Sequence, residues 1–167
     1  MRVGKTINNH RFFVIGLIYI SIASIVVSCG TDAIYDNNKE VDNSWSSNEK
    51  LNFNIDIKDT IGVYDIFLNI RNTTDYKYSN LYFFLKTTFP NQKISVDTIE
   101  CFLADTKGKW LGKGYGKYRD QQILFKQNGR FPMSGNYRIE IEQATRDIDL
   151  EGIKSIGLRI SKHKSIH

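Results

Sequence analysis

From Leu51 onward, apolar residues recur at every second position over most of the chain. Leu51, Phe53, Ile55 and Ile57 alternate with polar residues, and the same period returns in segments 64–71, 81–89, 94–103, 137–142 and 156–160. A period of two places the apolar side chains on one face of a strand, whereas a helix needs a period near 3.6. We therefore expect an all-β chain.

Turn-forming residues separate these segments, as at Asp59–Gly62, Asp105–Gly108 and Pro132–Gly135. Seven or eight short strands joined in this way indicate an antiparallel β-sandwich, immunoglobulin-like or jelly-roll-like. Tyr137, two residues after Gly135, resembles the turn-plus-tyrosine arrangement of immunoglobulin-like sandwiches, and we expect its ring in the core.

Local residue patterns predict the structure of two further segments. Gly112, Gly114 and Gly116 follow one another at spacing two, which predicts an edge strand or an ordered loop. Cys101 shares a predicted strand face with Ile99 and Leu103, which favours a buried structural thiol over a reactive one.

The first 28 residues have the pattern of a bacterial export signal. Arg2, Lys5 and Arg11 precede an apolar stretch from Phe12 to Val27, which is shorter than the roughly 20 residues of a membrane-spanning helix. Val26-Val27-Ser28-Cys29 fits a lipobox, so we expect cleavage before Cys29 and a diacylglyceryl group with fatty acid on this residue. Two or three acyl chains give durable membrane attachment, at about 0.8 kcal/mol per buried CH₂.

The expected organisation is then a signal peptide (1–28), a lipidated Cys and flexible tether (29–48), a β-sandwich domain (49–161) and a charged tail (162–167). The tether is rich in Asn, Asp and Ser, although Trp45 near its end is a candidate to pack on the domain. Removing the signal leaves 20 basic and 18 acidic residues, a net charge of +2, which gives nucleic-acid binding little support.

The positions of the histidines argue against most enzyme mechanisms. His10 lies in the signal, and His163 and His167 lie in the tail, so a catalytic triad or a zinc site in the domain is not expected. Asp65, Asp97, Glu100 and Asp105 could act without histidine, but they follow solvent-face or turn patterns. We expect no enzyme activity, and neither metal nor cofactor.

Two binding alternatives remain open at this point. Trp110, Tyr115 and Tyr118 surround the glycine-rich stretch and could form a platform for sugar rings, although alternating aromatic residues more often belong to a core. Asp147, Asp149 and Glu151 could hold Ca²⁺ in a loop, although solvated acids are the simpler interpretation.

Read together, the motifs of the chain resemble the GldH family of gliding-motility lipoproteins from Bacteroidetes. The blocks that carry the resemblance are Asp59-Thr60, Tyr64-Asp65, Arg71-Asn72, Asp75-Tyr76, Ser79-Asn80-Leu81, Phe89-Pro90, Asp97-Thr98-Ile99, Leu103-Ala104-Asp105, the central Gly108-Lys109-Trp110-Leu111-Gly112-Lys113-Gly114, Gly135-Asn136-Tyr137, Gln143-Ala144-Thr145-Arg146, Leu150-Glu151-Gly152-Ile153 and Gly157-Leu158-Arg159. Two departures are Asn91-Gln92, where the resemblance implies a Gly, and Thr145, where it implies Met.

The resemblance implies a non-enzymatic cell-envelope lipoprotein associated with gliding and with the type IX secretion apparatus. It implies partners among envelope proteins, which a surface with Arg71, Tyr76 and Tyr78 could contact. Surface export in this phylum commonly depends on several acids after the lipidated Cys, and Gly30-Thr31-Asp32-Ala33 contains one. This favours a periplasm-facing anchor in the outer membrane over the cell surface.

Overall fold

A computed structural model of the chain describes residues 32–42 and 44–164. The expected signal peptide and Cys29 lie outside the described residues. The strands of the described part are β1 (Ala33–Glu40), β2 (Ser44–Ser46), β3 (Leu51–Ile57), β4 (Tyr64–Thr73), β5 (Asn80–Thr88), β6 (Ile94–Phe102), β7 (Tyr118–Gly129), β8 (Gly135–Gln143), β9 (Asp149–Glu151) and β10 (Ile153–Lys162). In this part of the chain there is no helix long and apolar enough to cross a membrane.

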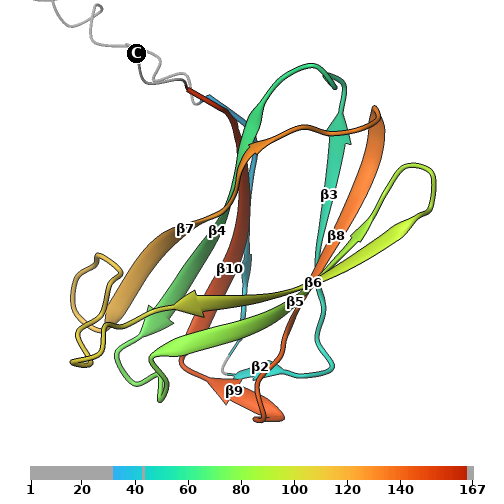
Figure 1. Ribbon diagram of the computed structural model, residues 1–167. Coiled ribbons are helices and arrows are strands. Elements are labelled where there is room, and N and C mark those ends of the chain that lie inside the picture. Colours follow the sequence, from blue (N-terminus) through green and yellow to red (C-terminus); the bar gives the residue numbers. More distant parts are fainter. Residues whose placement is uncertain (1–31, 43, 165–167) are drawn as a thin grey trace, which may run out of the picture. The chain divides into compact units, whose positions relative to one another are not determined.

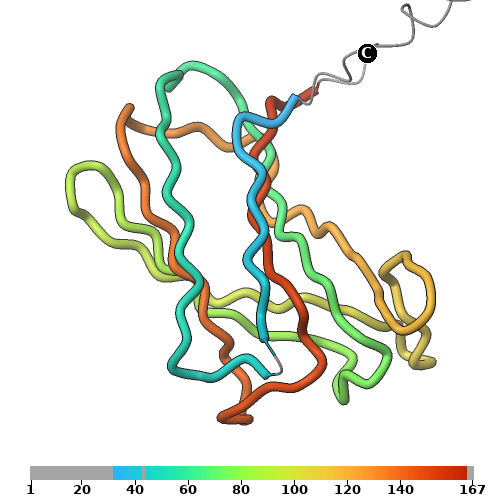
Figure 2. The backbone as a smooth tube through the Cα atoms, turned by 180° about the vertical axis from the view of Figure 1, so that it is seen from behind, coloured from blue at the N-terminus to red at the C-terminus, as the bar shows by residue number. Residues whose placement is uncertain are grey.

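Eight of these strands form two antiparallel four-stranded sheets (Figures 1 and 2). One sheet has the order β1-β10-β4-β7 and the other β3-β8-β5-β6, while β2 and β9 pair separately. Among connected strands of the two main sheets, only β5 and β6 are joined as a hairpin within one sheet; every other connection crosses to the opposite sheet. This is the double-sheet arrangement of a jelly roll, so of the two predicted sandwich types the jelly-roll-like one is observed.

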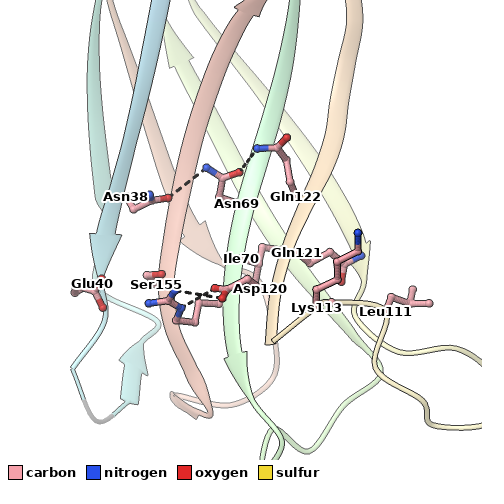
Figure 3. A pocket seen from close by; sticks show the side chains of 12 residues that line it. Asn38, Glu40, Asn69, Ile70, Leu111, Lys113, Asp120, Gln121, Gln122 and Ser155 are labelled. Carbon is pink, nitrogen blue, oxygen red and sulfur yellow. Dashed lines mark hydrogen bonds and ion pairs between the residues drawn. The ribbon is translucent and has the colours of Figure 1, made fainter. Parts of the chain in front are cut away.

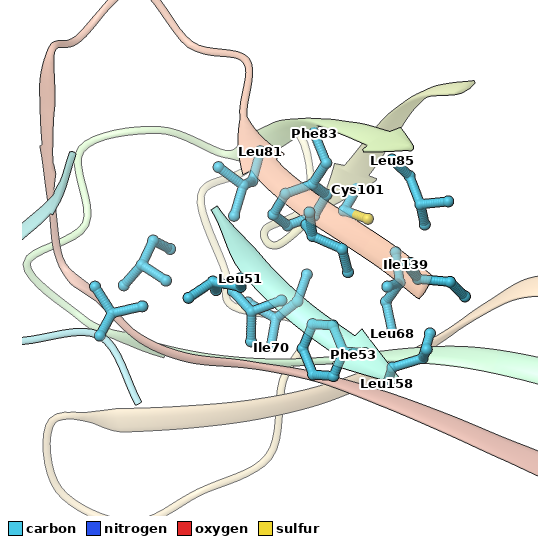
Figure 4. Packing of buried hydrophobic residues seen from close by; sticks show 14 of the residues in the cluster. Leu51, Phe53, Leu68, Ile70, Leu81, Phe83, Leu85, Cys101, Ile139 and Leu158 are labelled. Atoms are coloured by element: carbon cyan, nitrogen blue, oxygen red, sulfur yellow. The ribbon is translucent and has the colours of Figure 1, made fainter. Parts of the chain in front are cut away.

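The core lies between the inner faces of the two sheets (Figure 4). It is formed by the residues that the period of two had assigned inward: Phe53 of β3, Leu68 of β4, Phe83 of β5, Ile141 of β8 and Leu158 of β10 are all fully buried. Cys101 is also buried, and desolvation raises the pKa of its thiol to about 12, as expected of a structural cysteine. The alternation therefore predicted the faces of the main strands correctly.

The prediction of a flexible tether over residues 29–48 was wrong for most of that segment. Residues 33–40 form β1, which pairs with β10 from Ala33 opposite Ser161 to Glu40 opposite Ser155. Because β1 is an edge strand whose side chains are mostly exposed, it has no apolar alternation, and backbone pairing holds it in place. Trp45 of β2 is fully buried, with its ring 5.8 Å from that of Phe83, so the packing expected of it is confirmed.

The expected charged tail also begins later than predicted. β10 continues to Lys162, which lies opposite Tyr64. The backbone N–H of His163 donates to the carbonyl of Val63 at 2.8 Å, and its Nδ1 lies 2.8 Å from Oδ2 of Asp65. The folded unit thus extends at both ends beyond residues 49–161, because β1 pairs with β10 and the bonds of Lys162 and His163 continue past Ser161.

Candidate interaction surfaces

The three residues expected to form a partner-binding surface do not form one. Arg71 lies on the outer face of β4, where its Nε is 2.6 Å from Oδ1 of Asp120. Tyr76 is buried, and its hydroxyl donates to the carbonyl of Asn80 at 2.9 Å. Tyr78 is partly exposed and donates to Asp147 at 3.0 Å, a bond that raises the pKa of its hydroxyl. The sequence places these residues close together, but strand β4 ends between Arg71 and the two tyrosines.

The three aromatic residues expected as a sugar platform are also separated. Trp110 is half-buried against the core, whereas Tyr115 is 96% exposed and Tyr118 is 41% exposed. Among the ring pairs found in the described residues, none joins two of these three side chains. The ammonium of Lys117 lies 5.5 Å from the centre of the Tyr118 ring.

The glycine-rich stretch itself is an ordered loop, one of the two predicted forms. An antiparallel bridge between Lys113 and Asp120 folds it back on the start of β7. A Cβ on Gly114 would lie 2.2 Å from the carbonyl oxygen of Tyr118, and Gly116 has a φ of +60°. The glycines therefore serve close backbone approach and a left-handed turn.

Three of the four carboxylates considered for catalysis have structural partners, and the fourth, Asp97, is exposed on β6. Asp65 accepts from the Asn128 backbone and faces His163; burial acts to raise its pKa, but these two hydrogen bonds outweigh burial and lower it. Glu100 accepts from Asn80 at 2.7 Å, and Oδ1 of Asp105 accepts from two backbone N–H groups of its turn. These contacts are those of turns and sheet surfaces.

The three acids considered for Ca²⁺ do not converge. Asp149 and Glu151 flank the buried Leu150 on β9, and Glu151 lies 3.9 Å from the ammonium of Lys77. Asp147 accepts the hydroxyl of Tyr78. Within residues 32–42 and 44–164, no group of three or more His, Cys, Asp or Glu side chains is placed to hold a metal ion.

A polar groove of about 670 Å³ crosses the outer face of the β1-β10-β4-β7 sheet (Figure 3). Asn38, Asn69 and Gln122 lie in one row across it, because Asn38 and Asn69 are both opposite Gly157 and Asn69 is opposite Gln122. The Asn69 side-chain amide donates to Oδ1 of Asn38 at 3.4 Å, across Gly157, which lies between them. The Gln122 side-chain amide donates to Oδ1 of Asn69 at 2.9 Å. These side chains hydrogen-bond one another along the groove.

The outer face of the β5–β6 hairpin is apolar and exposed. Its large side chains are Tyr82, Phe84, Ile94, Val96 and Phe102, which we call the hairpin face. Ile94, Val96 and Phe102 are 58%, 62% and 58% exposed, although they belong to a regular strand. Glu100 lies among them, hydrogen-bonded to Asn80 and raising the pKa of Tyr82 through a second hydrogen bond. Exposed apolar side chains gathered on one surface are typical of protein-binding sites.

β6 is also the last strand of its sheet, so in the described part of the chain no strand pairs with its outer edge. The side-chain amide of Gln121 donates to the Phe102 carbonyl at 3.0 Å, which covers one end of that edge. Beside the edge a cleft of about 340 Å³ opens between the two sheets, with Ser95 and Asp97 at its β6 side and Phe125 at its β7 side. Both views show the turn of the hairpin projecting beside the sandwich (Figures 1 and 2).

Sequence reasoning missed the hairpin face because it assigned each strand a single apolar face. The signal was present in segment 94–103, where Ile94 and Val96 point to the opposite side from Ile99 and Cys101. Apolar residues on both faces of one strand predict either a central strand buried twice or an exposed face. Only the sheet order shows that β6 is an edge strand.

The chain matches the GldH lipoprotein family over residues 33–160. It belongs to this family. The gliding motility lipoprotein GldH homolog of Christiangramia forsetii is 38% identical over 154 residues, which cover 87% of this chain and 94% of that protein. The gliding motility lipoprotein GldH of Flavobacterium johnsoniae is 27% identical over 152 residues, with the same coverage of 87% and 94%. The resemblance noted in the sequence is thereby confirmed, and membership of a lipoprotein family implies a membrane anchor in the cell envelope.

Among solved structures, that of TmCBM61 in complex with β-1,4-galactotriose covers 77% of this chain and 71% of its own, with 13% sequence identity and a TM-score of 0.35. A likeness at this level identifies no ligand for a member of the GldH lipoprotein family.

Proposed function

We propose that this chain is a non-enzymatic lipoprotein that acts by protein–protein interaction in the gliding-motility and type IX secretion machinery of the cell envelope. Family membership supports the association with gliding motility. The catalytic candidates support a structural role, since Asp65, Glu100 and Asp105 each have a turn or sheet-surface partner and Asp97 is an exposed residue of β6. The anchor faces the periplasm from the outer membrane, because one acid follows Cys29 where surface export calls for several.

The anchor is the acylated Cys29, supported by the lipobox and the preceding apolar stretch. Replacing Cys29 by Ala removes the sulfur that would carry the diacylglyceryl group. We expect the Cys29→Ala protein to remain as an unprocessed precursor that takes up no labelled fatty acid. Incorporation of labelled palmitate at the level of the unaltered protein would refute the lipidation.

The observation that carries the interaction is the outer edge of β6, beside the hairpin face, with which no strand of residues 32–42 and 44–164 pairs. A partner strand could hydrogen-bond to this edge from Ile94 to Glu100 and place apolar side chains beside Val96 and in the cleft near Phe125. Exposed edges usually carry charged residues, Pro or a bulge that prevents such pairing. β6 has no Lys, Pro or bulge and pairs with β5 in regular register along its whole length, and its charged side chains are those of Asp97 and Glu100.

Complementation tests this function. A strain lacking the gene receives the unaltered chain, Val96→Glu, or the control Ile148→Glu. Ile148 is 69% exposed, comparable to the 62% of Val96, but it lies in the β8–β9 loop outside the hairpin face. We expect Val96→Glu to lose type IX secretion, and surface spreading if the organism glides, while Ile148→Glu retains both. Equal function of the two variants at equal protein levels would refute a role for the β6 edge.

The alternative of a glycan-binding surface lipoprotein has less support. Its main support was an exposed Trp110 in the platform with Tyr115 and Tyr118, and Trp110 packs against the core instead. The polar groove offers amide groups to a ligand, but these amides hydrogen-bond one another.

A further inference from the structure

One end of the sandwich presents a single, highly exposed aliphatic side chain on an ordered loop. Ile61, between β3 and β4, is 82% exposed. Oδ1 of Asp59 accepts from the backbone N–H groups of Ile61 and Gly62, both at 2.9 Å, and Oδ2 accepts from the hydroxyl of Tyr64 at 3.1 Å. The Tyr64 ring is buried 5.5 Å from the ring of Phe131. The loop therefore holds Ile61 outward from a fixed base.

The start of β1 lies at the same end of the sandwich. The Lys162 backbone N–H donates to the carbonyl of Asp32 at 3.2 Å, and the next residue, His163, donates to Val63 at the end of the Ile61 loop at 2.8 Å. Lys164 also forms an ion pair with Asp32. The first described residue of the chain and the Ile61 loop are thus joined through the end of β10.

Few residues separate this end from the expected anchor. Only Gly30 and Thr31 lie between Cys29 and Asp32, and three extended residue steps span at most about 11 Å. A flexible tether reaching to residue 48 would have let the domain clear the lipid headgroups, but β1 and β2 remove that freedom. With acyl chains on Cys29, Asp32 cannot move farther from the bilayer than this span.

We propose that the sandwich rests with its Ile61 end against the bilayer that holds its own acyl chains, and that Ile61 enters the headgroup region. This rests on the proposed acylation of Cys29. Exposed basic side chains lie at this end, namely Lys58, Arg130, Lys162 and Lys164; Lys58 lies 3.8 Å from Asp56, and Lys164 pairs with Asp32. Arg130 and Lys162 suit lipid phosphates, and the carboxylates at the same end are those of Asp32, Asp56, Asp59 and Asp65. An exposed apolar side chain on an ordered loop, flanked by long basic side chains, is the pattern of an interfacial contact.

The test places an environment-sensitive fluorophore on the acylated mature chain, at Ile61→Cys or at the matched control Ile148→Cys. Both side chains are exposed loop isoleucines, 82% and 69%, at opposite ends of the sandwich, and the buried Cys101 is not labelled. The proteins are placed in vesicles of phosphatidylethanolamine and phosphatidylglycerol that contain a lipid with a spin-labelled headgroup. We expect blue-shifted, quenched emission from position 61 and unshifted, unquenched emission from position 148.

Equal quenching at both positions, quenching at neither, or quenching at position 148 alone would overturn the proposal. Mass spectrometry beforehand reports acylation, so a chain recovered without lipid would overturn the anchor itself and this orientation with it. Circular dichroism checks that both labelled chains remain folded. The complementation experiment on Val96 is independent of these outcomes, because it measures partner binding at the β6 edge and not membrane contact of the Ile61 loop.

Discussion

The hydroxyl of Tyr137 donates a hydrogen bond to the carbonyl oxygen of Met133 at 2.8 Å. This bond fastens the turn before β8 to the core, where the Tyr137 ring meets Phe131 and Phe89 edge to face at 5.1 Å and 5.6 Å. The inward ring, predicted from the position of Tyr137 after Gly135, is confirmed.

Three substitutions at this turn should separate the contributions of the Tyr137 hydroxyl, the Tyr137 ring and the exposed Arg138 to the free energy of unfolding. Tyr137→Phe should lower the free energy of unfolding by about 1 kcal/mol, because the half-buried Met133 carbonyl loses its partner. Tyr137→Ala should cost about 3 to 5 kcal/mol, because it also leaves a cavity. Arg138→Ala, on the exposed face, should cost less than about 0.5 kcal/mol. Urea unfolding measures all three, and a larger loss for Arg138→Ala than for Tyr137→Ala would mean that the faces are reversed.

A chain that begins at residue 49 should not fold stably, whereas residues 32–164 should. The shorter chain lacks β1 and so exposes the edge of β10, and it lacks Trp45, which is fully buried beside Phe83. In the longer chain, Trp45→Ala alone should cost about 3 to 5 kcal/mol. Circular dichroism and binding of a hydrophobic dye measure this. A cooperative thermal transition of residues 49–161 equal to that of the longer chain would show that β1 and β2 are dispensable.

Gly114→Ala should destabilise the loop before β7. Its new Cβ would lie 2.2 Å from a backbone oxygen of Tyr118, so the chain must shift, at an expected cost of about 1 to 3 kcal/mol. The control Tyr115→Ala alters the neighbouring residue, which is 96% exposed, and should stay within about 0.5 kcal/mol. Urea unfolding compares them. Similar stability of the two variants would mean that the Lys113–Asp120 bridge does not form as described.

Gln92→Gly should stabilise the protein. Gln92 lies in the β5–β6 turn with a φ of 64°, a left-handed conformation that costs about 1 to 2 kcal/mol for a residue with a Cβ. Family resemblance implied a glycine in this turn. After the greater backbone entropy of glycine in the unfolded chain is subtracted, a net gain of about 0.5 to 1 kcal/mol is expected. A thermal midpoint below that of the unaltered chain would contradict this.

The acid dependence of stability should depend in part on Asp59. Hydrogen bonds from the backbone N–H groups of Gly62 and Ile61 and from the Tyr64 hydroxyl lower the pKa of its carboxyl. Because the pKa in the folded state is below the unfolded value of about 3.9, this stabilisation is present above that pH and is lost as pH falls through the folded pKa. The thermal midpoints of the unaltered chain and Asp59→Ala should therefore differ at pH 7 and converge toward pH 3. A difference that grows on acidification would show the opposite sign.

The sequence by itself determined the elements whose side chains alternate between core and solvent. Leu51 to Ile57 and Tyr137 to Ile141 had their faces assigned correctly, because a buried face imposes a period of two on whichever residues form it. Some of the motifs that carry the family resemblance lie in turns, where, as at Asp59, a side chain accepts hydrogen bonds from the local backbone.

Only the tertiary structure decided which strands are neighbours. β1 is held by backbone pairing with β10, which leaves no mark on side-chain polarity, so Ala33–Glu40 read as a tether. Arg71 and Tyr76 are near in sequence, but Arg71 lies on the outer face of the sheet and Tyr76 lies in the core. The hairpin face exists because β6 ends its sheet, and the Ile61 loop adjoins Asp32 because β10 lies between β1 and β4. Sheet order depends on contacts between distant segments, and a local pattern of residues does not encode it.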